Sequence, residues 1–429
     1  MNILIKDALI IPMTSEEEVV TGSLAIEGSV ISAIEKEIDP AGFAKVIDAS
    51  NCIVMPSLVN AHTHLSMLYF RNYGDQFHDL QSWLEAIWVL EEKLTAEDIY
   101  PASLLAMAEM IQSGSGCFSD MYFFPEGTIK ALFESGMKAN IGLTLFGDEK
   151  ETAYRLEAHL PFLQEASRQS NGSLLFDIAP HAVYTCTTGT YKLAAQSALK
   201  EHSRIHTHVA ETLKEVTDCL QTYGKTPVEY LASLGVFEAD SALAHGIHLT
   251  AKERAFIAKR HIPVIHNPSS NCKLACGIAP IADYQKEGIP LALGTDGPAS
   301  NNALDLFQEI RLAAMLSSVS TANPVALKPF EVLQMATFGG CRALGRADRS
   351  GTLQVGKEAD LIIIDTKAPH MQPLNDPLSA LVYSAKSSDV TTLINGGTIL
   401  MENRRLTTID IDSVRQEVQQ RWQSIKKRT

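Results

Sequence analysis

The sequence predicts an α/β protein: a (β/α)8 TIM-type barrel joined to a small composite β-sandwich domain formed from both chain ends. Apolar, strand-like segments alternate with amphipathic, helix-like ones over roughly 300 central residues, as expected for a parallel sheet closed into a barrel. Polar residues end six or more of these strands, whereas an open doubly wound sheet would draw its site from fewer strands. Both termini read as short strands separated by turns.

Eight segments are the predicted barrel strands. In chain order they are CIVMPSLVNAHTH, GCFSDMYFF, KANIGLTLFG, LLFDIAPHAVY, RIHTHVAE, SALAHGIHL, IPVIHNPSS and PLALGTDG. We therefore expect residues 1–55 to form the N-terminal part of the β domain and 56–348 the (β/α)8 barrel. Residues 349–429 are expected to complete the β domain and to end in a helix, DIDSVRQEVQQRWQSIKK.

Composition and charge limit the class of function. The chain has 429 residues, a net charge of -14 and no basic run before its last few residues, so nucleic acid is an improbable partner and a small molecule fits better. No apolar run reaches the roughly 18 to 20 residues that a membrane span needs. The start, MNILIKDALIIPM, is predicted to be a strand and not a signal peptide. Seven scattered cysteines without a CxxC pair indicate reduced thiols in a cytoplasmic protein.

Titratable side chains gather at the ends of the predicted strands. They are His62 and His64 on the first strand, His181 on the fourth, His206, His208 and Glu211 on the fifth, His245 on the sixth and Asp296 on the eighth. Parallel strands present their carboxyl ends on one face, which is where barrels of this type place their catalytic groups. The pattern therefore predicts one site at this mouth.

The HxH pair indicates a metal site only in combination with the other strand ends. His62 and His64 project to the same side of a strand because they are two residues apart. One histidine of the fifth strand and Asp296 would complete a set of three nitrogens and one oxygen, suited to zinc or another first-row metal. We choose His208 over His206, which we interpret as packed or hydrogen-bonded, because Glu211 then follows three residues later.

Acid–base chemistry is the second prediction for this mouth. A carboxylate just beyond the fifth strand can reach a metal-bound water without ligating the metal, so Glu211 is the candidate proton carrier. His245, at the end of the sixth strand, is the candidate for polarising the nucleophile or the leaving group.

Several motifs together resemble a known family. PSLVNAHTH, HVAET, HNPSSNCKLACGIAPI, LGTDGPASNN and GTLQVGKEADLIIID are similar to those of the amidohydrolase superfamily. More closely, they resemble its 5-methylthioadenosine/S-adenosylhomocysteine deaminases and the related triazine chlorohydrolases, and GCFSDMYFF and PHMQPLND point to the deaminases. The likeness covers almost the whole chain.

The resemblance implies a role for each matching residue. It makes His62, His64, His208 and Asp296 the ligands of one divalent metal, usually zinc, with iron, manganese and nickel left open. Glu211, His245 and Asp296 are implied to be catalytic, and Glu91, Arg155, His181 and Glu211 to bind substrate, with Glu92 open as the alternative to Glu91. Relatives commonly self-associate, so a homo-oligomer, dimer or tetramer, is also implied.

The implied reaction is hydrolytic deamination of a 6-aminopurine nucleoside to the inosyl product and ammonia. Some relatives bind the homocysteine carboxylate with two arginines; Arg155 matches one, but Leu143 stands at the other position, which favours an uncharged 5' group as in methylthioadenosine or adenosine. Alternatives are hydrolysis of a triazine, another nucleobase or a cyclic amide. Cyclic amide hydrolases usually carry a carboxylated lysine at the end of the fourth strand, where APHAVY has none. A metal-stabilised binding protein without turnover would have no need of Glu211.

Overall fold

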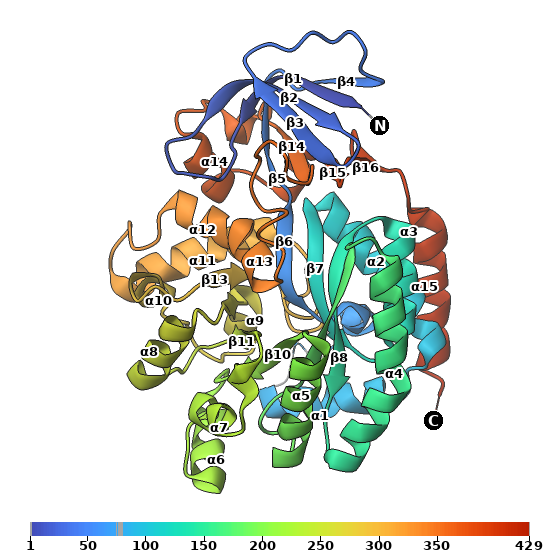
Figure 1. The fold of residues 1–429 in the computed structure, drawn as a ribbon, viewed down its shortest axis with the longest axis vertical. Helices are drawn as coiled ribbons and strands as arrows, with labels where there is room; N and C mark the ends of the chain where they lie inside the picture. Colours follow the sequence, from blue (N-terminus) through green and yellow to red (C-terminus); the bar gives the residue numbers. More distant parts are fainter. Residues whose placement is uncertain (1, 74, 76–79, 429) are drawn as a thin grey trace.

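The computed structural model describes residues 2–73, 75 and 80–428. Within this part of the chain two sheets are present: an eight-stranded parallel barrel and a nine-stranded sheet that covers one end of it (Figure 1). The predicted fold class is confirmed, because the barrel is built from the centre of the chain and the second sheet from both ends.

The barrel strands follow one another in sequence and in space. They are β6 (Leu58–Thr63), β7 (Ser115–Tyr122), β8 (Lys138–Leu145), β9 (Leu174–Pro180), β10 (Arg204–Val209), β11 (Ser241–His245), β12 (Val264–His266) and β13 (Leu291–Leu293). The chain just after β13 meets β6, where the Asp296 N–H donates to the His62 carbonyl at 3.0 Å and the Thr295 N–H to Asn60 Oδ1 at 3.0 Å. These bonds bring the first and last strand ends together.

Helices pack around the barrel; they lie between successive strands and, for the last three, after the final strand. They are α2 (Ala96–Gln112), α3 (Pro125–Ser135), α4 (Glu149–Gln169), α5 (Thr188–Glu201), α6 (Leu213–Tyr223), α7 (Pro227–Ser233), α8 (Ala251–Arg260), α9 (Pro268–Lys273), α10 (Ile281–Lys286), α11 (Leu306–Thr321), α12 (Pro329–Met335) and α13 (Phe338–Ala343). Local sequence sets where several of them begin: Thr187, Thr212 and Thr250 each cap a helix by accepting a backbone N–H. The short helices η1 (Leu65–Phe70) and α1 (Leu80–Glu91) follow β6.

The second sheet joins the two chain ends. Its strands are β1 (Ile3–Ile10), β2 (Val20–Glu27), β3 (Val30–Glu35), β4 (Lys45–Asp48), β5 (Cys52–Pro56), β14 (Leu361–Asp365), β15 (Val390–Asn395), β16 (Thr398–Glu402) and β17 (Arg405–Leu406). Antiparallel pairing of β5 with β14 links the N-terminal strands to the C-terminal ones. Ile3, Val54, Ile363 and Ile394 belong to its buried apolar core. The boundaries at 55/56 and 348/349 stay a prediction.

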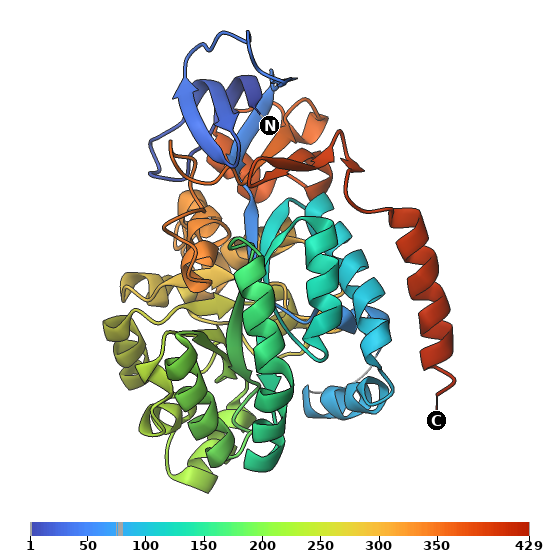
Figure 2. The same cartoon turned by 45° about the vertical axis from the view of Figure 1, so that its right-hand side comes forward.

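The C-terminal helix leaves the β sheet and lies along the barrel. Figure 2 shows α15 (Ile411–Ile425) running down the outside of the molecule, away from the sheet. Its Trp422 ring stacks on Tyr69 at 6.4 Å between centroids, and Arg428 pairs with the fully buried Asp98 of α2. Among the residues that the structure describes, no helix has both the length and the apolarity needed to span a bilayer.

Candidate active site

Four predicted metal ligands converge at the carboxyl end of the barrel. The Nε2 atom of His208 lies 3.1 Å from His62 Nε2 and 3.2 Å from His64 Nε2. Asp296 Oδ1 lies 3.4 Å from His62 Nε2 and 3.2 Å from His64 Nε2. All four side chains are buried. β6 supplies His62, the residue directly after β6 is His64, β10 supplies His208, and the turn after β13 supplies Asp296.

Backbone carbonyls fix the tautomers of two of these histidines. His64 Nδ1 lies 2.6 Å from the Met121 carbonyl, and His208 Nδ1 lies 2.8 Å from the His181 carbonyl. A carbonyl can only accept, so Nδ1 carries the proton and donates in each ring. The lone pair of each neutral ring is therefore on Nε2, the atom that faces the centre.

His62 is oriented by a chain of side chains. His62 Nδ1 lies 3.0 Å from His206 Nε2, and His206 Nδ1 lies 3.1 Å from Ser119 Oγ. If His62 donates from Nδ1, His206 accepts at Nε2 and donates from Nδ1 to the serine, and the Nε2 lone pair of His62 also faces the centre. His206 thus makes the hydrogen bonds expected of a supporting residue.

Asp296 divides its two carboxylate oxygens between the cluster and the protein. Oδ1 faces His62 and His64, whereas Oδ2 accepts from Ser270 Oγ at 2.6 Å and from Ser300 Oγ at 2.9 Å. Burial alone would raise the pKa of Asp296, but its hydrogen bonds to His62 and His64 hold that pKa well below the usual range. The aspartate is therefore a fixed negative charge directed at the histidines.

The electrostatics of the cluster favour a cation. Burial lowers the pKa of His62 to about 4. Burial also acts to lower the pKa of His64, yet the hydrogen bond and charge of Asp296 raise it to about 9. Three imidazole nitrogens and one carboxylate oxygen, separated by 3.1 to 3.4 Å where they adjoin, match the edge of about 3.3 Å of a tetrahedron with Zn–N bonds of about 2.0 Å. The residues present therefore fit a metal ion.

Glu211 and His245 border this cluster. Glu211 is buried at the end of β10, and burial raises the pKa of its carboxyl. Its Oε1 lies 3.8 Å from His245 Nδ1 and accepts from the Cys276 thiol at 3.6 Å. His245 Nδ1 also lies 2.8 Å from Asn271 Oδ1. Its ring is close enough that ligand atoms of His62, His208, His245 and Asp296 all lie within 4.8 Å of one another.

Strand ends at the site carry unusual backbone conformations. Ala210, His245 and Asp296 have φ angles of 52°, 71° and 60°, in the left-handed region that side chains with a Cβ rarely adopt. Such conformations persist where the surrounding structure imposes them, and they cluster at functional sites. Here they turn the chain sharply just where the polar side chains are presented.

The predicted substrate residues lie around the same mouth. The His181 ring is 4.6 Å from that of His208, and its Nδ1 lies 2.9 Å from Thr185 Oγ1. Glu91 accepts a 2.7 Å hydrogen bond from Tyr122 at the end of β7, and burial raises its pKa to about 7. Glu92 is exposed, so Glu91 is the glutamate of α1 that is directed toward the site.

Arg155 lies on α4 with its charge already engaged. Its Nε is 2.7 Å from Glu151 Oε1, one helical turn earlier, and its guanidinium lies over the Phe146 ring at 3.8 Å from the centroid. Phe146 contacts Phe123 edge-on at 5.5 Å, and Phe123 adjoins Tyr122. Arg155 is therefore linked to the Glu91 side of the site through aromatic rings.

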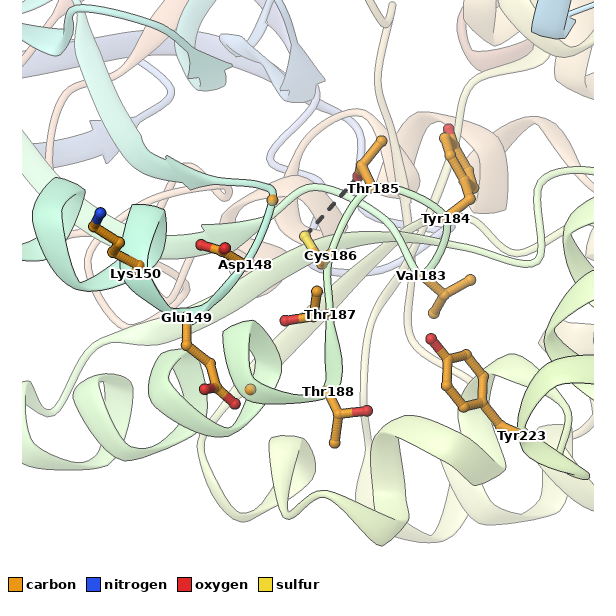
Figure 3. A pocket seen from close by; sticks show the side chains of 12 residues that line it. Asp148, Glu149, Lys150, Val183, Tyr184, Thr185, Cys186, Thr187, Thr188 and Tyr223 are labelled. Carbon is orange, nitrogen blue, oxygen red and sulfur yellow. Dashed lines mark hydrogen bonds between the residues drawn. The ribbon is translucent and has the colours of Figure 1, made fainter.

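A cavity of about 790 Å³ opens between the β8–α4 and β9–α5 connections (Figure 3). Asp148, Glu149 and Lys150 line one side of it and Thr185 and Thr187 the other, so carboxylate, ammonium and hydroxyl groups all contribute to its lining. Thr185 joins this space to the site because its Oγ1 is the partner of His181 Nδ1. The residues that line this cavity do not include the histidines of the cluster, so it adjoins the site only through Thr185.

Sequence reasoning assigned no role to several residues that hold the predicted ones. Ser119, Ser270, Asn271, Cys276, Ser300 and Tyr122 all make such contacts. Three of them lie in HNPSSNCKLAC, part of a motif that carries the family resemblance but to which the sequence assigned no function. The polar residues at and just beyond the end of the predicted strand IPVIHNPSS were the available signal.

Comparison with known proteins places the chain in a family. A model of the amidohydrolase family matches residues 53–400. The chain belongs to this family. The amidohydrolase is 41% identical over 429 residues to a 5-methylthioadenosine/S-adenosylhomocysteine deaminase of Caldanaerobacter subterraneus subsp. tengcongensis, covering 99% of both chains. It is 40% identical to a 5'-deoxyadenosine deaminase of Methanosphaera stadtmanae, over 95% of both chains.

A solved structure agrees with the fold of this amidohydrolase. An adenosine deaminase from Xanthomonas campestris, crystallised with bound zinc, superposes with a TM-score of 0.91 at 32% identity. The match covers 99% of this chain and 98% of that one, so both the barrel and the composite β sheet are shared.

Proposed function

We propose that this amidohydrolase is a metal-dependent hydrolytic deaminase of a 6-aminopurine nucleoside that forms the inosyl product and ammonia. The observation that carries the proposal is the convergence of three imidazole nitrogens and Asp296 beside a buried glutamate, Glu211. The names of its relatives, which include deaminases of methylthioadenosine, S-adenosylhomocysteine and 5'-deoxyadenosine, support the substrate class.

His62, His64, His208 and Asp296 would hold one divalent cation. When bound, the cation supplies Lewis acidity that lowers the pKa of water to about 7. Zinc is the first choice, because three imidazoles and one carboxylate suit it and the Xanthomonas campestris relative holds zinc. Iron, manganese and nickel are the alternatives, since the same ligands accept them.

Glu211 is the proton carrier in this proposal. Burial raises the pKa of its carboxyl, so the group can take a proton from the attacking water and give it to N1 of the purine as C6 becomes tetrahedral. Asp296 receives the second proton of that water, which leaves with the amino group as ammonia. His245, held by Asn271, presents its other nitrogen to the attacking oxygen.

His181 and Glu91 are proposed to bind the purine and the ribose. Both flank the cluster, and Glu91 is held by Tyr122. The 5' side favours an uncharged substituent, because Arg155, the predicted partner of a carboxylate, is already paired with Glu151. Methylthioadenosine and adenosine are therefore preferred to S-adenosylhomocysteine, whose carboxylate would have to displace Glu151 from Arg155.

A substrate panel tests the proposal directly. Purified protein loaded with zinc is incubated with methylthioadenosine, 5'-deoxyadenosine, adenosine and S-adenosylhomocysteine, and the adenine-to-hypoxanthine absorbance change and the released ammonia are measured. We expect turnover of the first three to exceed that of S-adenosylhomocysteine. If none of the four releases ammonia, the proposed function is wrong. Reloading the chelated protein with iron, manganese or nickel then identifies the metal that supports the highest rate.

The proposal also covers the oligomeric state of the protein and its location in the cell. We expect a cytoplasmic homo-oligomer, a dimer or tetramer, which acts on a small nucleoside and binds neither nucleic acid nor membrane. Light scattering coupled to size-exclusion chromatography measures the mass directly; a mass equal to one 46.8 kDa chain would contradict self-association.

A further inference from the structure

One short segment after β12 holds three proposed catalytic groups that come from three other strands. The segment runs from Asn267 to Cys276 and contains α9. Ser270 Oγ donates to Asp296 Oδ2 at 2.6 Å, and Asn271 Oδ1 lies 2.8 Å from His245 Nδ1. The third contact is made by Cys276, whose thiol donates to Glu211 Oε1 at 3.6 Å.

The segment is itself firmly held. The Asn271 N–H donates to the Asn267 carbonyl at 3.0 Å, and the Cys276 N–H donates to the Asn271 carbonyl at 2.9 Å. His248 Nε2 lies 2.7 Å from the Cys276 carbonyl, which it can reach only as a donor. Cys276 is 7% exposed, so its thiol has little water to bind in place of Glu211; the Leu274 carbonyl is a second acceptor, at the longer distance of 3.8 Å from Sγ. The thiol is thus positioned by backbone bonds on both sides.

The backbone next to the proposed catalytic groups is strained, and the main-chain contacts do not fix the Glu211 side chain. Ala210, immediately before Glu211, has a φ of 52°, and His245 and Asp296 are also left-handed. The N–H groups of Ala210 and Glu211 donate to the Glu215 carboxylate at 2.8 Å each, which fixes the main chain but not the Glu211 side chain. Among the residues that the structure describes, Cys276 and His245 contact the Glu211 carboxylate, and both contacts involve Oε1.

We infer that Cys276 is a positioning residue for Glu211: its thiol holds Oε1 and so turns Oε2 toward the substrate nitrogen. The inference rests on the proposed deaminase function for its kinetic consequence, but the hydrogen bond itself does not. A rotating carboxyl would spend part of its time with neither oxygen aligned for proton transfer, and fixing one oxygen removes that loss. The thiol touches no reacting atom, so it acts through Glu211.

Cys276→Ala and Cys276→Ser test the inference kinetically. Loss of one hydrogen bond from a thiol, a weak donor, predicts a kcat about 3- to 10-fold below that of the wild type in Cys276→Ala. KM should stay within about two-fold, because Cys276 does not bind the nucleoside. Cys276→Ser supplies a hydroxyl donor and should restore kcat to within about two-fold of the wild type. A structural role alone would give no rescue by serine.

Cys341→Ala is the matched control, since Cys341 is also buried but lies in a cluster with Val59, Cys117 and Leu344 away from the site. Its kcat should equal that of the wild type. The inference is overturned if Cys276→Ala keeps a kcat within two-fold of wild type, if its KM rises by the factor by which kcat falls, or if Cys276→Ser is as slow as Cys276→Ala.

An infrared measurement separates this inference from the proposed function. The S–H stretching band of Cys276 is assigned by its loss in Cys276→Ala. We expect it at a lower frequency in the wild type than in Glu211→Ala, because only the wild type offers a carboxylate acceptor. An unchanged frequency overturns the inference even if the enzyme deaminates nucleosides, and a shifted one supports it even if none of the tested nucleosides reacts.

Discussion

Two buried polar clusters lie at opposite ends of the barrel, and they are satisfied in different ways. At the amino end, Lys138 at the start of β8 donates to both carboxylate oxygens of Asp360 at 2.6 Å and pairs with Glu358. Gly396 N–H completes the set with a 2.7 Å bond to Asp360 Oδ1. At the carboxyl end, Nε2 lone pairs and Asp296 Oδ1 face one another.

The difference separates a structural cluster from a functional one. The amino-end cluster contains its own cation, Lys138. Burial acts to lower the pKa of Lys138, but the charges of Asp360 and Glu358 raise it. The carboxyl-end cluster directs acceptors at a common point, an arrangement that a positive charge at that point stabilises. Lys138, which is buried, lies at the end of the barrel opposite to the site. This position counts against a carboxylated-lysine mechanism for cyclic amides.

Asp296→Asn and Asp360→Asn are the strongest test of this contrast. Asp296→Asn removes the anionic ligand, so we expect bound metal to fall well below one ion per chain and turnover to drop by roughly 10³-fold or more. Asp360→Asn should lower the melting temperature by several degrees while leaving the metal content unchanged. Elemental analysis and thermal denaturation measure the two effects. Loss of metal in Asp360→Asn would show that the clusters are not independent.

Glu211→Gln tests the proton transfer at the carboxyl-end cluster without removing a predicted metal ligand. Glutamine keeps the shape of the side chain but cannot carry a proton, so kcat should fall by about 10²- to 10⁴-fold. Metal content, measured by elemental analysis, should equal that of the wild type. A variant that lost its metal would identify Glu211 as a ligand instead of a proton carrier.

Each of the two clusters contains a serine that donates to its aspartate, so replacing each serine by alanine compares the clusters through smaller effects. Ser270 donates to Asp296 at 2.6 Å, and Ser350 donates to Asp360. Ser270→Ala should weaken metal affinity by about 10- to 100-fold, because groups that orient a ligand have effects of that size. Ser350→Ala should leave metal affinity unchanged and reduce stability by about 1 kcal/mol. Competition with a chelator measures the affinity, and equal affinities in both variants would reject the role of Ser270.

Much of the fold and the metal cluster could be predicted because both follow from spacing. The HxH pair and the strand-end positions of His208 and Asp296 are determined by alternation along strands and by the common direction of parallel strands. Polar residues at or just beyond the strand ends, such as His64, His245 and Asp296, indicate this convergence from the sequence alone.

The partners of these residues could not be predicted, since they depend on tertiary geometry. Lys138 and Asp360 are 222 positions apart and meet only because the β sheet covers the amino end of the barrel. Whether Glu91 or Glu92 faces the site depends on the rotation of α1, because neighbouring residues on a helix point about 100° apart. Arg155 was predicted without its partner, although Glu151 stands four residues earlier on the same helix.

The Arg155–Glu151 pair is an intermediate case and gives the smallest expected effect. Its positive and negative charges are paired with each other, as in the amino-end cluster, yet the pair lies at the carboxyl end of the barrel, on the side of the metal cluster. Glu151→Gln leaves the guanidinium without its anion, so kcat/KM for S-adenosylhomocysteine should rise relative to methylthioadenosine by about 2- to 5-fold, the range of a partly exposed ion pair. Glu157→Gln, an exposed glutamate on the same helix, is the control and should leave the ratio unchanged. Competition between the two substrates in one reaction measures the ratio directly. An unchanged ratio in Glu151→Gln would mean that Arg155 stabilises α4 against Phe146 and takes no part in choosing the substrate.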